Sequence, residues 1–156
     1  MTAESKLLVI GYGNPGRQDD GLGPGCAALL ADFIKQEKPC WPIDIDINYQ
    51  LTVEHALAVS KANAVIFIDA ARQLSSAYQY SQLTSSEGNV WSYHIVTPGQ
   101  CLWLAEMLYG KRPEAYLLAI QGVQFDNFEE RLSDTALCNL NKAFQFLLIQ
   151  LDRLLY

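Results

Sequence analysis

The chain has 156 residues, the size of one domain with one hydrophobic core, so we predict a single domain over residues 1–156. Half of the residues are apolar, yet no run approaches the roughly 18–20 apolar residues of a membrane span, and residues 1–6 lack the features of a signal peptide. The net charge of −6, with no basic cluster longer than Lys111-Arg112, disfavours nucleic acid and anionic membranes as partners. We expect a cytoplasmic monomer that binds neither nucleic acid nor membranes.

Strand-like and helix-like segments alternate along the chain. Strands are expected at 7–12, 43–49, 64–68 and 115–120, with weaker candidates at 78–83 and 90–94. Helices are expected at about 22–34, 52–61, 98–108 and 133–155. The alternation predicts an α/β fold, a three-layer α/β/α sandwich around a twisted, mostly parallel sheet of about five strands.

Periodicity also predicts which residues are buried. Isoleucines alternate with Asp44, Asp46 and Asn48 in the strand 43–49, which is typical of a half-buried strand near a sheet edge. The last helix is expected to bury one stripe, formed by Leu137, Leu140, Phe144, Leu147, Leu151 and Leu154. Four widely spaced cysteines without a C-x-x-C pair are expected to be small core residues, namely Cys26, Cys40, Cys101 and Cys138.

The first strand leads into a glycine-rich turn that carries two adjacent carboxylates. Gly11-x-Gly13-x-x-Gly16 matches the spacing of a dinucleotide-binding loop, in which backbone N–H groups and a helix N-terminus receive a pyrophosphate. Asp19 and Asp20 are expected to occupy the place of the phosphates, and like charges at that distance repel by several kcal/mol in a partly dry site. The stretch therefore favours a metal over a phosphate, although free N–H groups around Gly11–Asn14 would also suit an oxyanion or a peptide tail.

Three side chains with metal-binding chemistry follow predicted strands. Asp20 follows the first strand, Asp69 ends the apolar strand 64–68, and His94 precedes the helix at Thr97-Pro98. Sites in open parallel sheets form outside the carboxyl ends of the strands, so we expect these side chains to meet. Two carboxylates and one imidazole leave coordination positions for water or substrate. Asp69 could equally cap the turn that follows it.

Other chemistries have weaker support. His55 lacks the second histidine of an H-E-x-x-H motif, so we interpret it as structural or solvent-facing. A Cys101–His94 nucleophile pair stays open, but Cys101 lies in an apolar helical pattern without an evident activating group.

In combination, these motifs resemble the hydrogenase maturation endopeptidases, and the resemblance covers nearly the whole chain. The matching segments are Gly11-x-Gly13-Asn14-Pro15 with Asp19-Asp20-Gly21-x-Gly23, Gln50-Leu51-Thr52-x-Glu54, Phe67-Ile68-Asp69-Ala70, His94 with Thr97-Pro98, and Leu108-Tyr109-Gly110-x-x-Pro113. The resemblance implies that Asp20, Asp69 and His94 match the family's nickel-binding positions and serve as its catalytic site. It also implies a twisted sheet between layers of helices.

The function implied by the resemblance is removal of the C-terminal extension from a NiFe-hydrogenase large-subunit precursor. In the family the nickel is supplied by the substrate precursor, so the three side chains would complete the coordination of a substrate-borne metal; a resident metal is the alternative. Either cation would polarise a carbonyl or generate hydroxide. Two alternatives remain: a nucleotide-binding regulatory domain that uses Gly11, Gly13 and Gly16, and a metal-binding chaperone without hydrolysis.

Overall fold

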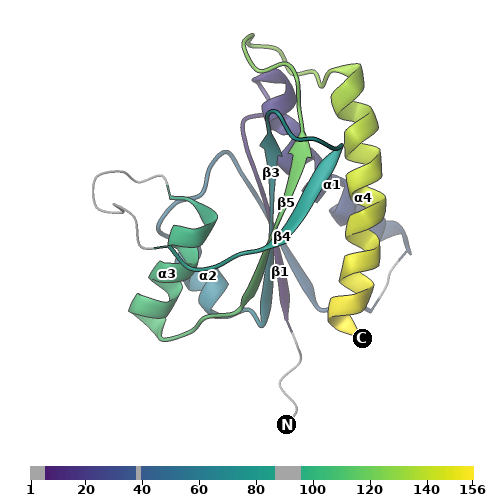
Figure 1. Cartoon of the computed structure of the whole chain (residues 1–156). Coiled ribbons are helices and arrows are strands. Elements are labelled where there is room, and N and C mark those ends of the chain that lie inside the picture. The colour runs from purple at the N-terminus through teal and green to yellow at the C-terminus, as the bar shows by residue number, and fades with distance from the viewer. Residues whose placement is uncertain (1–5, 38–39, 87–95) are drawn as a thin grey trace.

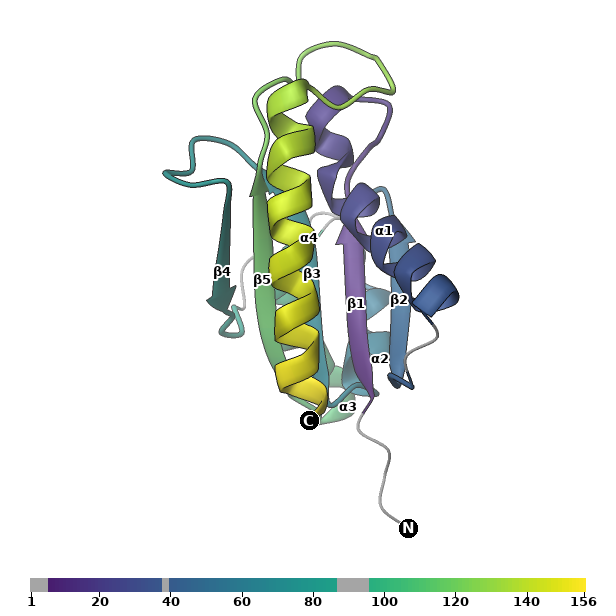
Figure 2. The same cartoon turned by 90° about the vertical axis from the view of Figure 1, so that its right-hand side faces the viewer.

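A computed structural model describes residues 6–37, 40–86 and 96–156. Its strands are β1 (Leu7–Tyr12), β2 (Ile43–Asn48), β3 (Ala64–Ala71), β4 (Tyr78–Gln82) and β5 (Glu114–Gln121). Its helices are the short 3-10 helix η1 (Gln18–Gly21) and the α-helices α1 (Leu22–Glu37), α2 (His55–Ser60), α3 (Pro98–Tyr109) and α4 (Asp134–Leu155). The sheet order is β2-β1-β3-β5-β4, in which only β4 runs antiparallel to its neighbour (Figure 2).

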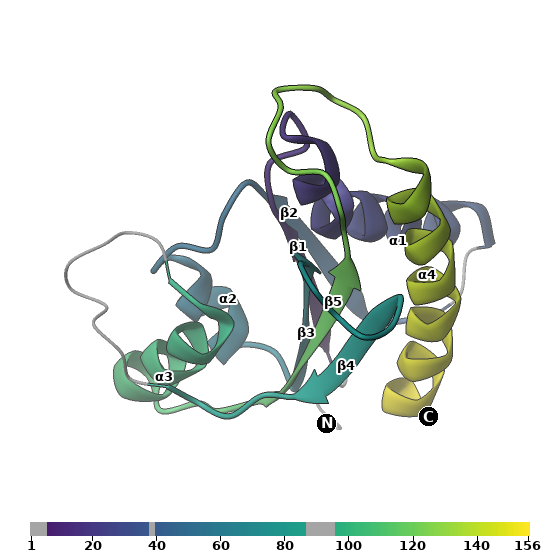
Figure 3. The same cartoon turned by 45° about the horizontal axis from the view of Figure 1, so that its top comes forward.

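Helices cover both faces of the sheet, as the sequence predicts. Helices α1 and α4 lie on one face, and α2 and α3 lie on the other (Figures 1 and 3). Alternate residues of β1 supply the two cores: Leu7 and Val9 pack with α1 and α4, whereas Leu8 and Ile10 pack with α2 and α3. The α/β/α prediction is therefore confirmed, and β2 is an edge strand as its alternating pattern indicates.

Two glycines bring the start of α1 directly against the sheet. A Cβ atom on Gly23 would lie 2.6 Å from the carbonyl oxygen of Ile68 and would also collide with the backbone of Tyr12. A Cβ atom on Gly11 would collide with the Gly23 carbonyl and with Ala27. This close approach holds η1 and the first turn of α1 beside the carboxyl ends of β1 and β3.

Capping residues define where helices α3 and α4 begin and where α3 ends. Thr97 caps α3 with a reciprocal capping box, in which its hydroxyl accepts from the Gln100 N–H and the Gln100 side chain accepts from the Thr97 N–H. Gly110, in the left-handed conformation at φ 66°, ends that helix. Ser133 caps α4 by accepting from the Ala136 N–H.

Several predictions from the sequence need correction. Helix α2 begins at His55, not at residue 52, so His55 is its first residue. Leu137 is 46 % exposed, and Ala136, Asn139 and Ala143 share the buried face of α4 with Leu140, Leu147 and Leu151. Cys26 and Cys101 are core residues, but Cys40 and Cys138 are exposed. The weak strand expected at 90–94 lies outside the described residues.

No helix among the described residues has both the length and the apolar character that crossing a membrane requires.

Candidate active site

The carboxyl ends of β1 and β3 bring Asp20 and Asp69 into one site. Asp69 is the sixth residue of β3, and Asp20 lies in η1, which follows the loop after β1. Both side chains are partly buried. The Asp20 carboxylate is close enough that its charge contributes to raising the pKa of Asp69. The structure thus brings together two of the three predicted site residues.

Asp69 is a carboxylate in an environment that favours its neutral form. Burial raises the pKa of Asp69 from its usual value of 3.8 to about 6, because the ionised form is removed from water. Hydrogen bonds from the Tyr12 hydroxyl and the Ala70 N–H oppose this shift, and the charge of Asp20 adds to it. Within the described part of the chain, no lysine or arginine pairs with Asp69 or Asp20. A cation between these carboxylates would stabilise both ionised forms.

The loop after β1 holds Asp20 through one hydrogen bond. The Asn14 N–H donates to Asp20 Oδ2 at 2.7 Å, and the Asn14 side chain in turn accepts from the Gly16 N–H at 2.9 Å. The Gly13 N–H donates to the Asn48 carbonyl at 3.0 Å. Because the N–H groups of Gly13 and Asn14 have internal partners, they are not the free oxyanion donors that the glycine pattern suggests.

Asp19 has a structural role, which corrects the expectation that both aspartates face the loop. Its side chain is fully buried and accepts from the N–H groups of Val123, Gln124 and Ser133 and from the Ser133 hydroxyl, at 2.7–2.9 Å. Burial opposes ionisation, but these donors outweigh it and lower the pKa of Asp19. Asp19 thus ties η1 to the start of α4, and Asp20 alone of the pair faces Asn14.

Tyr12 is a site residue that the motif analysis missed. It follows Gly11, which pairs with Ile68, so Tyr12 and Asp69 are next to each other in the register of β1 and β3. Burial raises the pKa of the Tyr12 hydroxyl, and the charge and hydrogen bond of Asp69 raise it further, so the hydroxyl remains a donor. The signal was the parity of the strand: Tyr12 has the same parity as Leu8 and Ile10 and therefore faces the α2–α3 side with Asp69.

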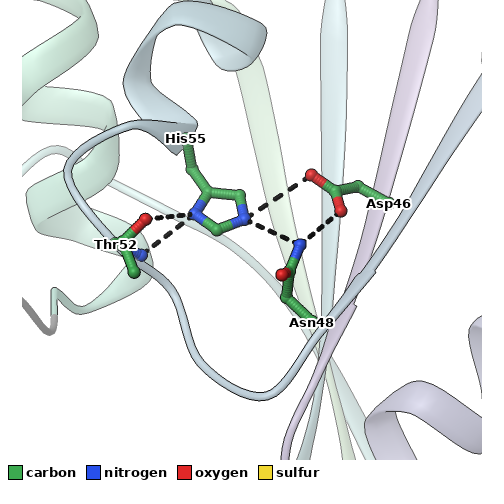
Figure 4. Close-up of polar contacts among 4 residues, drawn as sticks. All are labelled: Asp46, Asn48, Thr52 and His55. Carbon is green, nitrogen blue, oxygen red and sulfur yellow. Dashed lines mark hydrogen bonds and ion pairs between the residues drawn. The ribbon is translucent and has the colours of Figure 1, made fainter.

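His94 lies outside the described residues, so its predicted position stays a prediction. The other histidine, His55, is 8 % exposed, which rules out the solvent-facing interpretation and agrees with the structural one. Its Nδ1 accepts from the Thr52 N–H at 2.9 Å, and its Nε2 lies 3.5 Å from Asp46 Oδ2 and 3.3 Å from Asn48 Nδ2 (Figure 4). A backbone N–H can only donate, so the ring proton sits on Nε2 and faces the end of β2. His55 thus fixes the turn between β2 and α2.

Cys101 is not an activated nucleophile. The side chain is fully buried in α3, and burial raises the pKa of its thiol to about 12. A thiol with that pKa is protonated at neutral pH, and the thiolate is the nucleophilic form. The Cys101–His94 alternative therefore loses its chemical basis.

Asp20 and Asp69 fit part of the coordination shell of a cation. Among residues 6–37, 40–86 and 96–156, no group of three or more His, Cys, Asp and Glu side chains could hold a metal ion by itself. Asp20 and Asp69 supply two oxygen ligands, and one oxygen of Asp20 is already engaged by Asn14. Two carboxylates form part of a coordination shell, which others must complete.

The architecture is an α/β/α sandwich with its candidate site at the carboxyl edge of a mostly parallel sheet, and several solved structures with a similar fold are named as hydrogenase maturation proteases. The hydrogenase maturating endopeptidase HybD from E. coli has 20 % sequence identity and a TM-score of 0.66, with 95 % of this chain and 93 % of that chain covered. The [NiFe] hydrogenase maturation protease HycI from Thermococcus kodakarensis has 15 % identity and a TM-score of 0.70, covering 97 % and 95 %. The hydrogenase 2 maturation peptidase from the Thaumarchaeota archaeon SCGC_AB-539-E09 has 22 % identity and a TM-score of 0.64, covering 94 % and 97 %.

These likenesses confirm the resemblance at the level of the fold, over nearly the full length of both chains. No family model matches the sequence, and no curated protein matches it.

Proposed function

We propose that this chain is an endopeptidase that removes the C-terminal extension of a nickel-loaded NiFe-hydrogenase large-subunit precursor. The observation that carries the proposal is the pairing of Asp20 and Asp69 at the carboxyl edge of the sheet, in a fold shared with structures named as hydrogenase maturation proteases. No lysine or arginine among the described residues pairs with these carboxylates, so a positive charge between them would stabilise their ionised forms. A nickel ion held by the substrate supplies that charge.

In this proposal, nickel belongs to the substrate and Asp20, Asp69 and His94 complete its coordination. The cation polarises the scissile carbonyl or lowers the pKa of a water molecule. Asn14 fixes the Asp20 carboxylate, and Tyr12 fixes that of Asp69, so both ligands are oriented before the substrate arrives.

The test is incubation of the purified protein with nickel-loaded and nickel-free precursors, followed by mass spectrometry of the large subunit. We expect loss of the C-terminal segment from the nickel-loaded precursor alone. Binding of the loaded precursor without cleavage would instead support a metal-binding chaperone. Cleavage of both forms at equal rates would contradict recognition of nickel.

Two histidine variants test whether His94 or His55 is the third ligand. We expect His94→Ala to abolish cleavage, a loss beyond the roughly 10–100-fold of residues that only support ligands. His55→Ala, which removes the other histidine, should retain cleavage with lower stability, because His55 only fixes the β2–α2 turn. Cleavage by the His94 variant together with loss in the His55 variant would place the third ligand at His55.

A further inference from the structure

A pocket lies beside the loop that holds Asp20. It has a volume of about 300 Å³ and is lined by Gly13, Pro15, Pro24, Ile47, Asn48 and Tyr49. The volume is at the lower end of the roughly 300–1,000 Å³ range of small-molecule sites, so the pocket suits one or two amino-acid side chains and not a dinucleotide. No acidic or basic side chain lines it.

The walls of the pocket expose apolar surface next to the acidic site. Ile47 and Tyr49 are 46 % and 70 % exposed at the end of the edge strand β2. Exposed apolar side chains around a depression are typical of a surface that contacts a partner. The two prolines complete an apolar surface from the β1 loop and from α1.

The pocket and the candidate active site share one loop. Gly13 and Pro15 line the pocket, while Asn14 between them donates its N–H to Asp20 at 2.7 Å. The pocket therefore borders the loop that positions Asp20, along which a peptide bound at Asp20 would pass. Peptide-recognition sites commonly gain specificity in this way, from pockets that take individual side chains.

The pocket is also fixed before any ligand binds. The Gly13 N–H donates to the Asn48 carbonyl at 3.0 Å, which joins the two sides of the pocket. His55 holds the turn that follows through the Thr52 N–H and faces Asn48 and Asp46 (Figure 4). A preformed pocket costs less conformational entropy on binding than a mobile one.

We propose that this pocket is a specificity subsite that receives an apolar side chain of the peptide substrate close to the scissile bond. The subsite rests on the proposed peptidase function and extends it, because it selects the substrate by an apolar residue in addition to the metal. Ile47 and Tyr49 determine the specificity and take no part in the chemistry.

The kinetic test compares Ile47→Thr with Ile149→Thr, using the nickel-loaded precursor as substrate. Thr keeps the branched Cβ, and Ile149 is a matched control because it is 54 % exposed on α4 and does not line the pocket. We expect KM to rise about tenfold in Ile47→Thr with kcat within twofold, and no change in Ile149→Thr, since an apolar contact made equally in ground and transition states affects binding alone. An unchanged KM in Ile47→Thr and in Tyr49→Ser would overturn the subsite.

A binding test separates this inference from the proposed function. N-acetyl-leucinamide and N-acetyl-lysinamide are titrated into the full chain, and backbone amide signals are followed by NMR. We expect the leucine probe to shift Gly13, Ile47 and Asn48 in the wild type and to shift them less in Ile47→Thr. Equal shifts with both probes, or none, would overturn the subsite even if the precursor is cleaved. Failure of the wild type to cleave any precursor, with selective leucine shifts, would reject the peptidase and leave an apolar ligand pocket.

Discussion

The burial of Asp69 beside Asp20 makes it a candidate site residue and at the same time destabilises the folded protein. Its raised pKa means that the folded chain must either protonate this carboxylate or hold its charge out of water beside Asp20. A residue that destabilises the fold in this way is typical of a functional position.

We expect Asp69→Asn to increase stability and abolish cleavage. A shift from 3.8 to about 6 corresponds to about 3 kcal/mol, and we expect about 2 kcal/mol of it to appear because the residue is only partly buried. The folded pKa is raised, so the penalty is absent below about pH 4, grows between pH 4 and 6, and is complete above pH 6. Urea unfolding of both proteins with a chelator present should show the variant to be more stable at pH 8 and equal at pH 3.5. A less stable variant at pH 8 would mean that the ionised carboxylate is well solvated or paired.

The neighbours Asp19 and Asp20 form a matched pair with opposite expected effects. Asp19→Ala removes the acceptor of four hydrogen bonds and leaves three N–H groups unpaired. We therefore expect the free energy of unfolding to fall by about 3–5 kcal/mol. Asp20→Ala removes one acceptor at the loop, so we expect a loss near 1 kcal/mol together with loss of cleavage. Thermal unfolding and the cleavage assay separate the two roles. Normal cleavage by a folded Asp20→Ala protein would exclude Asp20 from the site.

The sequence predicted that Asp20 and Asp69 lie at the same sheet edge, and it did not predict the buried structural role of Asp19. An acidic residue that ends an apolar strand is a strong local signal, because strand direction alone places it at the sheet edge. The difference between Asp19 and Asp20 depends on residues 123, 124 and 133, which reach η1 only through the tertiary fold. Tyr12 was missed for the same reason, since its partner lies on another strand.

At the scale of elements, the contact between α1 and the sheet depends on residues without side chains. We expect Gly23→Ala to destabilise the protein by about 3 kcal/mol, because the added Cβ meets backbone atoms that cannot move aside. Gly25→Ala is the control in the same helix: its Cβ would lie 3.9 Å from Leu140 Cδ2, so we expect a gain of about 0.5–1 kcal/mol from helix propensity. Chemical denaturation measures both. Equal effects would show that α1 moves away from β1 at little cost.

Strong periodicity and capping signals located the elements well. Thr97-Pro98 and Gly110 gave the bounds of α3, and the alternating isoleucines identified β2 as an edge strand. The error at Leu137 arose because a stripe of large residues was assumed to define the buried face of α4. The small residues Ala136 and Ala143 are fully buried in the core on the face of α4 that packs inward, whereas Leu137 lies off this face.

At the scale of the whole molecule, a parallel sheet with a Gly-x-Gly-x-x-Gly loop is compatible with two functions. A nucleotide site needs backbone N–H groups that point outward from the loop and from a helix that starts directly after it. Here η1 intervenes before α1 begins at Leu22. Each N–H from residue 13 to residue 20 also has a protein acceptor, except for Pro15, which has no N–H.

We therefore expect neither NAD nor ATP to bind this chain. Occupying the loop with a diphosphate would require breaking internal hydrogen bonds and would place phosphate beside the Asp20 and Asp69 carboxylates, which repel it. Isothermal titration calorimetry should show no saturable heat for either nucleotide up to millimolar concentration, with or without magnesium. Asp20→Ala is an informative control because it frees the Asn14 N–H and removes one charge; a weak signal in that variant alone would identify Asp20 as the excluding group. Saturable micromolar binding to the wild type, with shifts of the Gly13 and Asn14 amide signals, would restore the nucleotide-binding alternative, because the loop would then have exchanged its internal acceptors for phosphate.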